Sequence, residues 1–322
     1  MRKVKPVSLL IALSLAGACS SNVTPCTTCG GDGGIRIGDG GDVIPANAEI
    51  FPPDNPWNTD VSDPNRFPTD PMSDQYLGSI GMTTGLHSDF DSIGDGIPFV
   101  IVPGTQPKVP IDFTAYPDES DPGPYPIPDD APIENDSDAH VIAVDFDNGF
   151  LYELYNGSKA AVGWSADNGA VFNLRSNMLR PLGWTSADAA GLPIFPGLVK
   201  YDEVVNQQAI HHALRFTVAK SQMGFVSPAR HAAGSCALNS ACPPMGMRVR
   251  LKAATAIDGF PPSVQVILTA LKKYGMIVAD NGSDWYISGE PNANWNDDEL
   301  HTLSGIHGSD FEVIATGAIT PQ

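Results

Sequence analysis

Basic residues are scarce in this chain: 18 lysines and arginines stand against 37 aspartates and glutamates, which gives a formal net charge of −19 at pH 7. Proteins that bind nucleic acid contact its phosphates through a basic face, so this composition excludes nucleic acid as a partner. The acidity is uneven, because residues 1–138 hold 21 acidic and 6 basic residues whereas residues 139–322 hold 16 and 12. The excess of acid therefore lies in the N-terminal part, where it favours solubility.

Several fingerprints of catalysis are also missing from the sequence. There is no glycine-rich phosphate loop, so nucleotide chemistry is not indicated and no cofactor is expected. There is no G-x-S-x-G elbow, which argues against a serine hydrolase. Beyond residue 18 no apolar run approaches the roughly 20 residues that a membrane-spanning helix needs. The body of the chain is long enough to bury a core without help from a metal.

The first 18 residues are typical of a signal peptide. Three basic residues precede an apolar run over residues 7–15, which is too short to stay in the membrane as a permanent helix. The ending LAGAC, with its cysteine at Cys19, resembles the lipobox of bacterial lipoproteins. That resemblance implies cleavage before Cys19, lipidation of its thiol and attachment to the cell envelope, and the serines that follow favour the outer membrane. We expect the membrane to be contacted through this lipid anchor only.

Four of the five cysteines remain when Cys19 is set aside, an even number that suits an oxidising compartment. Cys26 and Cys29 form a C-x-x-C pair near the N-terminus, and Cys236 and Cys242 bracket a loop of small residues. We expect two local disulfides. The alternative is a zinc site of four thiolates, but it would require these distant segments to meet.

Composition divides the rest of the chain in two. Residues 19–47 are rich in glycine and aspartate and predict a flexible tether, whereas residues 48–322 predict a single β-rich domain that we expect to be monomeric. The domain begins with a proline-rich arm that carries Phe51 and Trp57, which we expect to pin it to the surface. Residues 89–95 hold three aspartates; a calcium loop is conceivable there, but the full alternating ligand pattern is absent and a plain loop is favoured.

About ten short strands and two or three short helices are expected in the domain. The clearest hairpin joins residues 139–146 to residues 150–155 through Asp-Asn-Gly, and the same tripeptide at 167–169 and 280–282 is interpreted as turn chemistry. The most convincing helix covers residues 263–274, with Ser263 as its cap, and a shorter one covers residues 297–303. This pattern predicts a mainly β fold, a sandwich or a distorted jelly roll with long ordered loops.

The stretch from residue 163 to residue 203 attracts attention because its apolar residues lie between turn-formers. We expect an ordered loop laid across a sheet, which is where sites tend to form. Trp164, Trp184 and Tyr201 could be platforms for sugar rings. The alternative is that the two tryptophans fill the core.

Candidate groups for acid–base chemistry are two carboxylates and two histidines. Glu153 and Asp188 are the acid and base candidates, although Asp188 would also suit the first turn of a short helix. His140 and His212 lie on apolar strand faces, where a buried structural role is the alternative to catalysis. A metal site that combines both histidines with a third lacks supporting spacing, so no metal is expected. Arg230 and His231 lie in a Pro/Gly-flanked loop and could hold an anion or a sugar hydroxyl.

Four strings resemble a family of secreted bacterial proteins without an assigned activity: GWTSADAAGLPIFPGLVKYDEV, HALRF, PPMGMRVRLKA and ALKKYGMIVADNGSDWYISG. The similarity covers roughly residues 50–316, and the loop between Cys236 and Cys242 departs from the pattern. It implies an extracellular or surface role and favours a glycan substrate, because the family recurs in genomes rich in polymer-degrading enzymes. It carries over no catalytic residue.

The function expected from the sequence is therefore a surface lipoprotein with a carbohydrate-active domain, a glycoside hydrolase that acts on a polysaccharide or a cell-wall glycan. A lipoprotein that binds such a glycan without catalysis is the first alternative. A polysaccharide lyase, with His212 as base and Arg230 facing a uronate, is the second. The test that separates them is whether the candidate residues converge on one open cleft.

Overall fold

A computed structural model describes residues 44–45 and 48–322, which all belong to one compact unit. Strand (24%) exceeds helix (16%) and forms several sheets, so the prediction of a mainly β fold with a few short helices is confirmed. The predicted signal peptide, the lipidated Cys19 and the Cys26–Cys29 pair lie outside the described residues.

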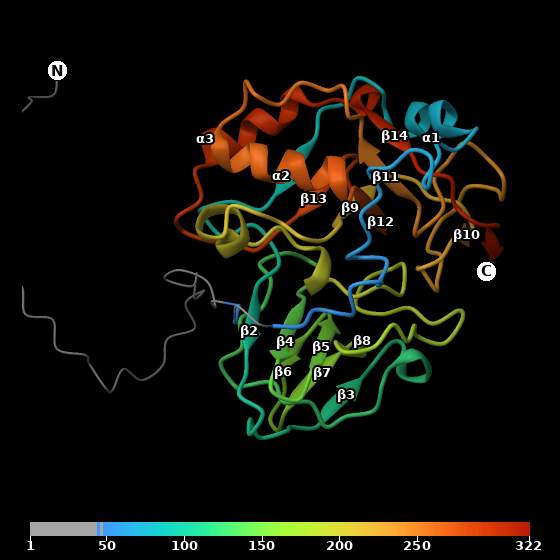
Figure 1. Ribbon diagram of the computed structural model, residues 1–322. Helices are drawn as coiled ribbons and strands as arrows, with labels where there is room; N and C mark the ends of the chain where they lie inside the picture. Colours follow the sequence, from blue (N-terminus) through green and yellow to red (C-terminus); the bar gives the residue numbers. More distant parts are fainter. Residues whose placement is uncertain (1–43, 46–47) are drawn as a thin grey trace, which may run out of the picture. The chain divides into compact units, whose positions relative to one another are not determined.

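The largest sheet has six strands in the order β1-β13-β9-β12-β11-β14 (Figure 1). One of its faces is apolar, since side chains alternate along a strand and every second position is buried and hydrophobic. Phe216, Trp285 and Phe311 stack in series on this face, with ring centroids 5.8 and 5.0 Å apart. The strands are β1 (His87–Asp89), β9 (Leu214–Val218), β11 (Arg248–Leu251), β12 (Met276–Asn281), β13 (Tyr286–Ser288) and β14 (Phe311–Val313).

The other face of this sheet is polar. Arg215 of β9 pairs with Ile277 of β12, and its guanidinium donates to the hydroxyl of Ser288 of β13 on this side. A row of buried polar groups is costly unless each group finds a partner. The chain meets this demand by laying the loop between residues 184 and 199 over the polar face, as the ion pair between Asp188 of the loop and Arg215 shows.

Two smaller sheets form a sandwich of their own. The four-stranded sheet runs β2-β4-β5-β8 and the three-stranded sheet runs β3-β7-β6. One face of the four-stranded sheet joins the main core through Ile142 and Leu151, and its other face packs with Trp164 through Ala143 and Leu154. The strands are β2 (Phe99–Ile101), β3 (Ile111–Phe113), β4 (Val141–Asp145), β5 (Phe150–Tyr155), β6 (Ser158–Lys159), β7 (Trp164–Ala166) and β8 (Asn168–Asn173); a separate pair is β10 (Gly224–Phe225) with β15 (Thr320–Pro321).

Two of the three α-helices found within residues 48–322 match the sequence prediction. Helix α2 (Pro262–Lys273) and helix α3 (Asp297–His301) occur where they were expected, but Ser263 does not cap α2: the helix begins after Pro261, and the Ser263 hydroxyl donates instead to Glu299. Helix α1 (Ser73–Ile80) was not predicted. It has only about two turns, too short for its buried positions to show a helical period. The short helical turns are η1 (Pro117–Glu119), η2 (Phe195–Gly197), the π-helical η3 (Asp202–Asn206), η4 (Thr302–Gly305) and η5 (Gly308–Asp310).

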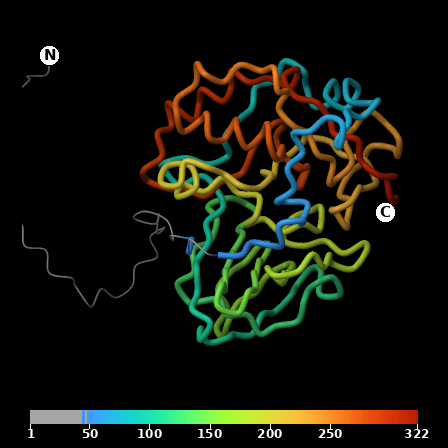
Figure 2. The backbone as a smooth tube through the Cα atoms, viewed as in Figure 1, coloured from blue at the N-terminus to red at the C-terminus, as the bar shows by residue number. Residues whose placement is uncertain are grey.

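The N-terminal arm runs from the smaller sheets to the large one (Figure 2). Phe51 donates its backbone N–H to Leu174 O, and Val61 donates its own to Lys273 O. The rings expected to pin the arm are buried, with Trp57 only 2% exposed. The arm therefore links the segment after β8 to the end of α2.

Candidate functional site

A β-bulge in β12 places a carboxyl group beside the buried Arg215. Ile277 pairs with Arg215 and Val278 with Phe216, but the next pair joins Asp280, not Ala279, to Thr217. The extra residue turns Asp280 onto the polar face of the sheet, as bulges beside functional sites commonly do. The carbonyl of Ala279 accepts the backbone N–H of Ala190 at 2.9 Å, and this bond ties the loop between residues 184 and 199 to β12.

Beneath Asp280 lies a sealed ion pair between Arg215 and Asp188. The guanidinium of Arg215 donates to both carboxylate oxygens of Asp188, Nη2 to Oδ1 at 2.9 Å and Nε to Oδ2 at 3.2 Å, and it lies 3.8 Å from Asp280 Oδ2. Asp188 is fully buried, whereas the side chain of Asp280 is 20% exposed. Partial burial and the Asp188 carboxylate raise the pKa of Asp280 to about 7. Asp280 is therefore a carboxyl group that can carry a proton near neutral pH.

The segment that carries Asp188 is a rigid turn. The Ser186 hydroxyl donates to Leu192 O at 2.6 Å and accepts the backbone N–H of Asp188 at 2.9 Å. Gly191 has a φ of +69°, and a side chain there would meet the carbonyl of Trp184. Together with the contact between Ala190 and Ala279, these bonds hold the turn against β12.

A second ion pair lies next to the first. His140, 2% exposed, contacts Glu134 Oε2 through Nδ1 at 2.5 Å and Ala187 O through Nε2 at 3.0 Å. Burial alone would lower the pKa of His140, but the Glu134 carboxylate raises it to about 9. With acceptors on both ring nitrogens, His140 is a charged structural group that fastens residue 134 to the loop.

These groups lie under an open cleft of about 300 Å³. Asp138 and Asp280 contribute carboxyl groups, and Tyr116 and Tyr155 contribute rings. Burial raises the pKa of Asp138, and the charge of Asp280 acts in the same direction. The remaining lining residues are Thr185, Ser186, Ala187, Ala189, His231, Ala233 and Asn281.

Backbone strain marks the wall of the cleft. Ala139, between Asp138 and His140, has a φ of +44°, a conformation that costs a non-glycine residue free energy. It is held by the backbone N–H of Gly157, which donates to Ala139 O at 2.9 Å. Strain of this kind is common at functional sites, and here it lies next to Asp138, which lines the cleft.

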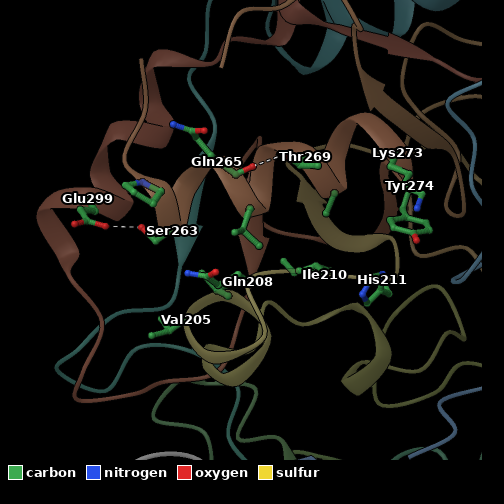
Figure 3. Close-up of a pocket in the computed structure, with 15 residues that line it drawn as sticks. Val205, Gln208, Ile210, His211, Ser263, Gln265, Thr269, Lys273, Tyr274 and Glu299 are labelled. Carbon is green, nitrogen blue, oxygen red and sulfur yellow. Dashed lines mark hydrogen bonds between the residues drawn. The ribbon is translucent and has the colours of Figure 1, made fainter. Parts of the chain in front are cut away.

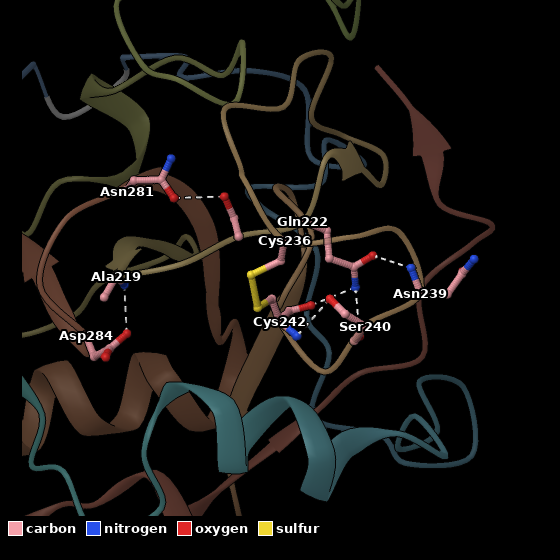
Figure 4. Close-up of a disulfide and its surroundings, with 9 residues drawn as sticks. Ala219, Gln222, Cys236, Asn239, Ser240, Cys242, Asn281 and Asp284 are labelled. Carbon is pink, nitrogen blue, oxygen red and sulfur yellow. Dashed lines mark hydrogen bonds between the residues drawn. A yellow bond between two sulfur atoms is a disulfide. The ribbon is translucent and has the colours of Figure 1, made fainter.

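The disulfide supports the opposite wall, where Asn281 Nδ2 donates to Ala233 O at 3.0 Å. Figure 4 shows the disulfide and Asn281. Cys236 and Cys242 are bonded, with Cα atoms 6.4 Å apart, so this predicted pair is confirmed. Inside the loop the buried Gln222 accepts from Asn239 N and donates to Cys242 O. The loop therefore presents Ala233 to the cleft in a fixed position.

Glu153, a predicted acid or base, does not line the cleft. It is fully buried, and its carboxylate accepts the backbone N–H groups of Ile194 and Phe195 at 2.9 to 3.0 Å. Burial raises its pKa to about 7, although these N–H groups act in the opposite direction. Its contacts fix the loop between residues 184 and 199 to β5, so Glu153 is not part of the candidate site.

His212 lies in a different, sealed cluster. Its Nε2 is 3.1 Å from Glu203 Oε2 and 3.2 Å from Lys200 Nζ, and Lys200 is fully buried. Burial would raise the pKa of Glu203, but Lys200 and His212 lower it to about 2. No opening reaches this cluster from the cleft, whose lining includes none of the three.

The predicted binding residues are divided between the rim and the core. His231 lines the cleft, with Nδ1 2.7 Å from Ala189 O, and Trp184 is half-buried near it, with the Arg180 guanidinium 5.6 Å from its ring. Arg230 is half-buried and donates to Arg180 O. Trp164 is 1% exposed in the core, which leaves no ring face for a sugar.

Tyr201 also lies away from the cleft. Its ring packs against Trp295 at 4.9 Å, and its backbone N–H donates to Glu290. The aspartates that suggested calcium are partly used within their own loop, since Asp91 Oδ1 accepts three backbone N–H groups. Across residues 44–45 and 48–322 no cluster of His, Cys, Asp or Glu is arranged to hold a metal ion.

Sequence reasoning missed Asp280, Asp138 and Arg215. Asp280 was assigned to a turn because it begins Asp-Asn-Gly, and simple alternation along β12 would have sent it to the apolar face. The available signal was the unusual Arg215 inside an otherwise apolar strand, since a buried arginine needs carboxylates around it.

A larger hollow of about 620 Å³ lies between η3 and α2 (Figure 3). Its lining is mainly apolar, with Ile210 and Val266 among its residues, and Ser263 and Glu299 bond to each other at its rim. It brings together no pair of carboxyl groups with raised pKa, so volume alone does not make it the site of acid–base chemistry.

Comparison with known proteins adds no relative: no family model, no curated protein and no solved structure matches the chain. In the described part of the chain, none of the helices has the length and apolar character to cross a membrane.

Proposed function

We propose that the protein is a carbohydrate-active hydrolase whose catalytic groups are Asp280 and Asp138. The observation that carries this proposal is the pair of carboxyl groups in one open cleft, one of them with a pKa of about 7. Glycoside hydrolysis requires a protonated carboxyl group and an ionised one on opposite sides of a glycosidic bond. Rings at the cleft, here Tyr116 and Tyr155, suit the apolar faces of sugars.

In this proposal Asp280 is the general acid. Its proton is transferred to the leaving glycosidic oxygen, and burial together with the Asp188 carboxylate raises the pKa of Asp280 to about 7 so that it can carry this proton. Asp138 accepts the proton of the attacking water. Arg215 is a positioning residue, because it fixes Asp188 and remains beneath the cleft floor.

The predicted surface location is part of the same proposal. The lipobox-like ending at Cys19 supports a lipid anchor in the cell envelope, and the resemblance to secreted bacterial proteins supports a polysaccharide or cell-wall glycan as the partner. The acidic cleft favours glycans without carboxylates, because a uronate would face Asp138 and Asp280. This makes a lyase that acts on uronates the weaker alternative.

The test is a polysaccharide screen with the secreted chain, in which reducing ends and unsaturated-uronate absorbance are followed together. Hydrolysis predicts new reducing ends without absorbance, and their loss in Asp280→Asn. Glu153→Gln and Asp112→Asn are the comparison variants; Asp112 is an exposed aspartate on β3, outside the cleft. Absorbance in place of reducing ends would make the protein a lyase, and retention on a glycan without turnover would make it a binding protein.

A further inference from the structure

A second polar hollow, of about 310 Å³, lies beside β1. Its distinguishing feature is a pair of parallel rings: His87 and Tyr286 stack with centroids 4.2 Å apart and an interplanar angle of 13°. His87 is exposed and Tyr286 is half-buried, so the outer side of the pair is open to solvent. Among the described residues, the Asp89 carboxylate beside this pair has no side-chain hydrogen bond, unlike Asp91.

The ring pair is in line with the catalytic carboxyl group. His87 pairs with Tyr286, Tyr286 with Thr217, and Thr217 with Asp280, so one row crosses four adjacent strands. With strands about 4.8 Å apart, two steps place Tyr286 roughly 10 Å, and three steps place His87 roughly 14 Å, from Asp280 along the sheet. One sugar ring cannot bridge this distance, whereas a chain of several linked rings can.

The surface between the two hollows is polar and exposed. The connection over residues 281–284 crosses the row, with Ser283 O accepting from the Thr217 hydroxyl. Asn281 and Ser283 are exposed on this connection, and Asn281 also lines the cleft. A glycan chain that leaves the cleft past Asn281 meets hydrogen-bonding groups before it reaches the rings.

We propose that the hollow of His87 and Tyr286 is a distal subsite for an uncharged sugar unit of the same glycan chain. The inference rests on the proposed function, and it makes the substrate an oligosaccharide or polysaccharide instead of a disaccharide. Stacked rings supply the face on which a sugar lies, and Asp89 supplies an acceptor for its hydroxyl groups. The aspartates of the hollow, Asp89, Asp91, Asp95 and Asp297, disfavour a uronate there.

The experiment measures affinity against chain length. Full-length protein carrying Asp280→Asn, which prevents turnover, is titrated by calorimetry with β-1,4-linked disaccharides and hexasaccharides of glucose, xylose, mannose and N-acetylglucosamine. We expect a hexasaccharide to bind at least tenfold more tightly than its disaccharide. Adding Tyr286→Ala should remove about tenfold from the hexasaccharide affinity and leave the disaccharide affinity unchanged, since one aromatic contact contributes about 1.4 kcal/mol.

Two further variants keep the test sharp. Tyr116→Ala, in the cleft, should weaken both lengths equally, and His87→Ala, at an exposed position, should weaken only the hexasaccharide even if Tyr286→Ala lowers stability. Unchanged hexasaccharide affinity in both ring variants, equal loss at both lengths, or no binding of any neutral hexasaccharide overturns the subsite. Length-dependent binding together with an absence of hydrolysis of every polysaccharide would overturn the hydrolase and leave the subsite in place.

Discussion

Two clusters of buried charge, one around Arg215 of β9 and one around His212 just before β9, differ in one respect. Arg215, Asp188 and Asp280 form a cluster that opens into a cleft, whereas Lys200, Glu203 and His212 form one that is sealed. In the sealed cluster each charged group has an oppositely charged partner, and these interactions hold η3 in place. In the open cluster, burial and the neighbouring Asp188 carboxylate both raise the pKa of Asp280. The difference teaches that the carboxyl group whose pKa is raised and which faces an opening is the one that lacks a full set of favourable partners.

The substitution Asp280→Asn is the strongest test of the difference between the two clusters. We expect glycan hydrolysis to fall by about 10² to 10⁴-fold, because the proton donor is lost while shape is kept. Turnover is measured as reducing ends released per enzyme. Retained activity in Asp280→Asn would remove the open cluster from catalysis, and the matched change Glu203→Gln in the sealed cluster should leave turnover unchanged at temperatures where that variant is folded.

Lys200→Met tests the sealed cluster. Removing one partner of a buried ion pair leaves the other charge uncompensated, so we expect a loss of about 3 to 5 kcal/mol of unfolding free energy. Urea denaturation followed by tryptophan fluorescence measures it. A change of less than about 1 kcal/mol would show that Lys200 is not a buried, paired charge, and glycan affinity at low temperature should not change.

The two clusters should also respond oppositely to pH. The folded pKa of Glu203 is about 2, below its ordinary value of 4.5, so its contribution to stability is present above pH 4.5 and is lost as pH falls towards 2. The pKa of Asp280 is raised from 3.8 to about 7, so it favours the folded state at low pH and this contribution is lost as pH rises from about 4 through 7. Each shift corresponds to on the order of 2 to 4 kcal/mol.

Stability curves of two variants check these signs. Between pH 5 and pH 8, Asp280→Asn should gain stability relative to the unmodified chain, and below pH 4 Glu203→Gln should lose less than the unmodified chain does. The same raised pKa predicts that hydrolysis declines as pH rises through about 7. A rate that increases from pH 7 to pH 9 would contradict Asp280 as the acid.

The smallest expected effect comes from the disulfide. Replacing Cys236 and Cys242 by serine opens a short loop, and we expect a loss of about 2 kcal/mol. Because Ala233 and Asn281 join this loop to the cleft, disaccharide affinity should fall by a few fold, whereas the sealed cluster should be unaffected. Calorimetry of the double variant measures the change in disaccharide affinity, and thermal unfolding measures the change in stability. Unchanged affinity would mean that the cleft wall keeps its structure without the disulfide.

Much of the fold could be predicted because alternation and turn residues act locally. The hairpin of β4 and β5 follows from alternating apolar residues around Asn148-Gly149, and α2 follows from its apolar face. The candidate site could be predicted only in part: Asp188 and His140 were selected and lie beneath the cleft, but Asp280 and Asp138 were not. Their positions depend on a one-residue bulge and a strained Ala139, which are products of tertiary packing and leave no periodic signal in the sequence.

The bulge at Ala279 has a consequence for how the site could be dismantled. If Ala279 were deleted, β12 would become a regular strand in which Asp280 follows Val278 and still pairs with Thr217. The carbonyl that accepts Ala190 N would be gone, and with it the fastening of the turn that carries Asp188. Shortening the chain by one residue would thus separate the effects of Asp188 and Asp280 while both residues remain in the sequence. The pKa values in this cleft can therefore be changed by insertion and deletion as well as by substitution.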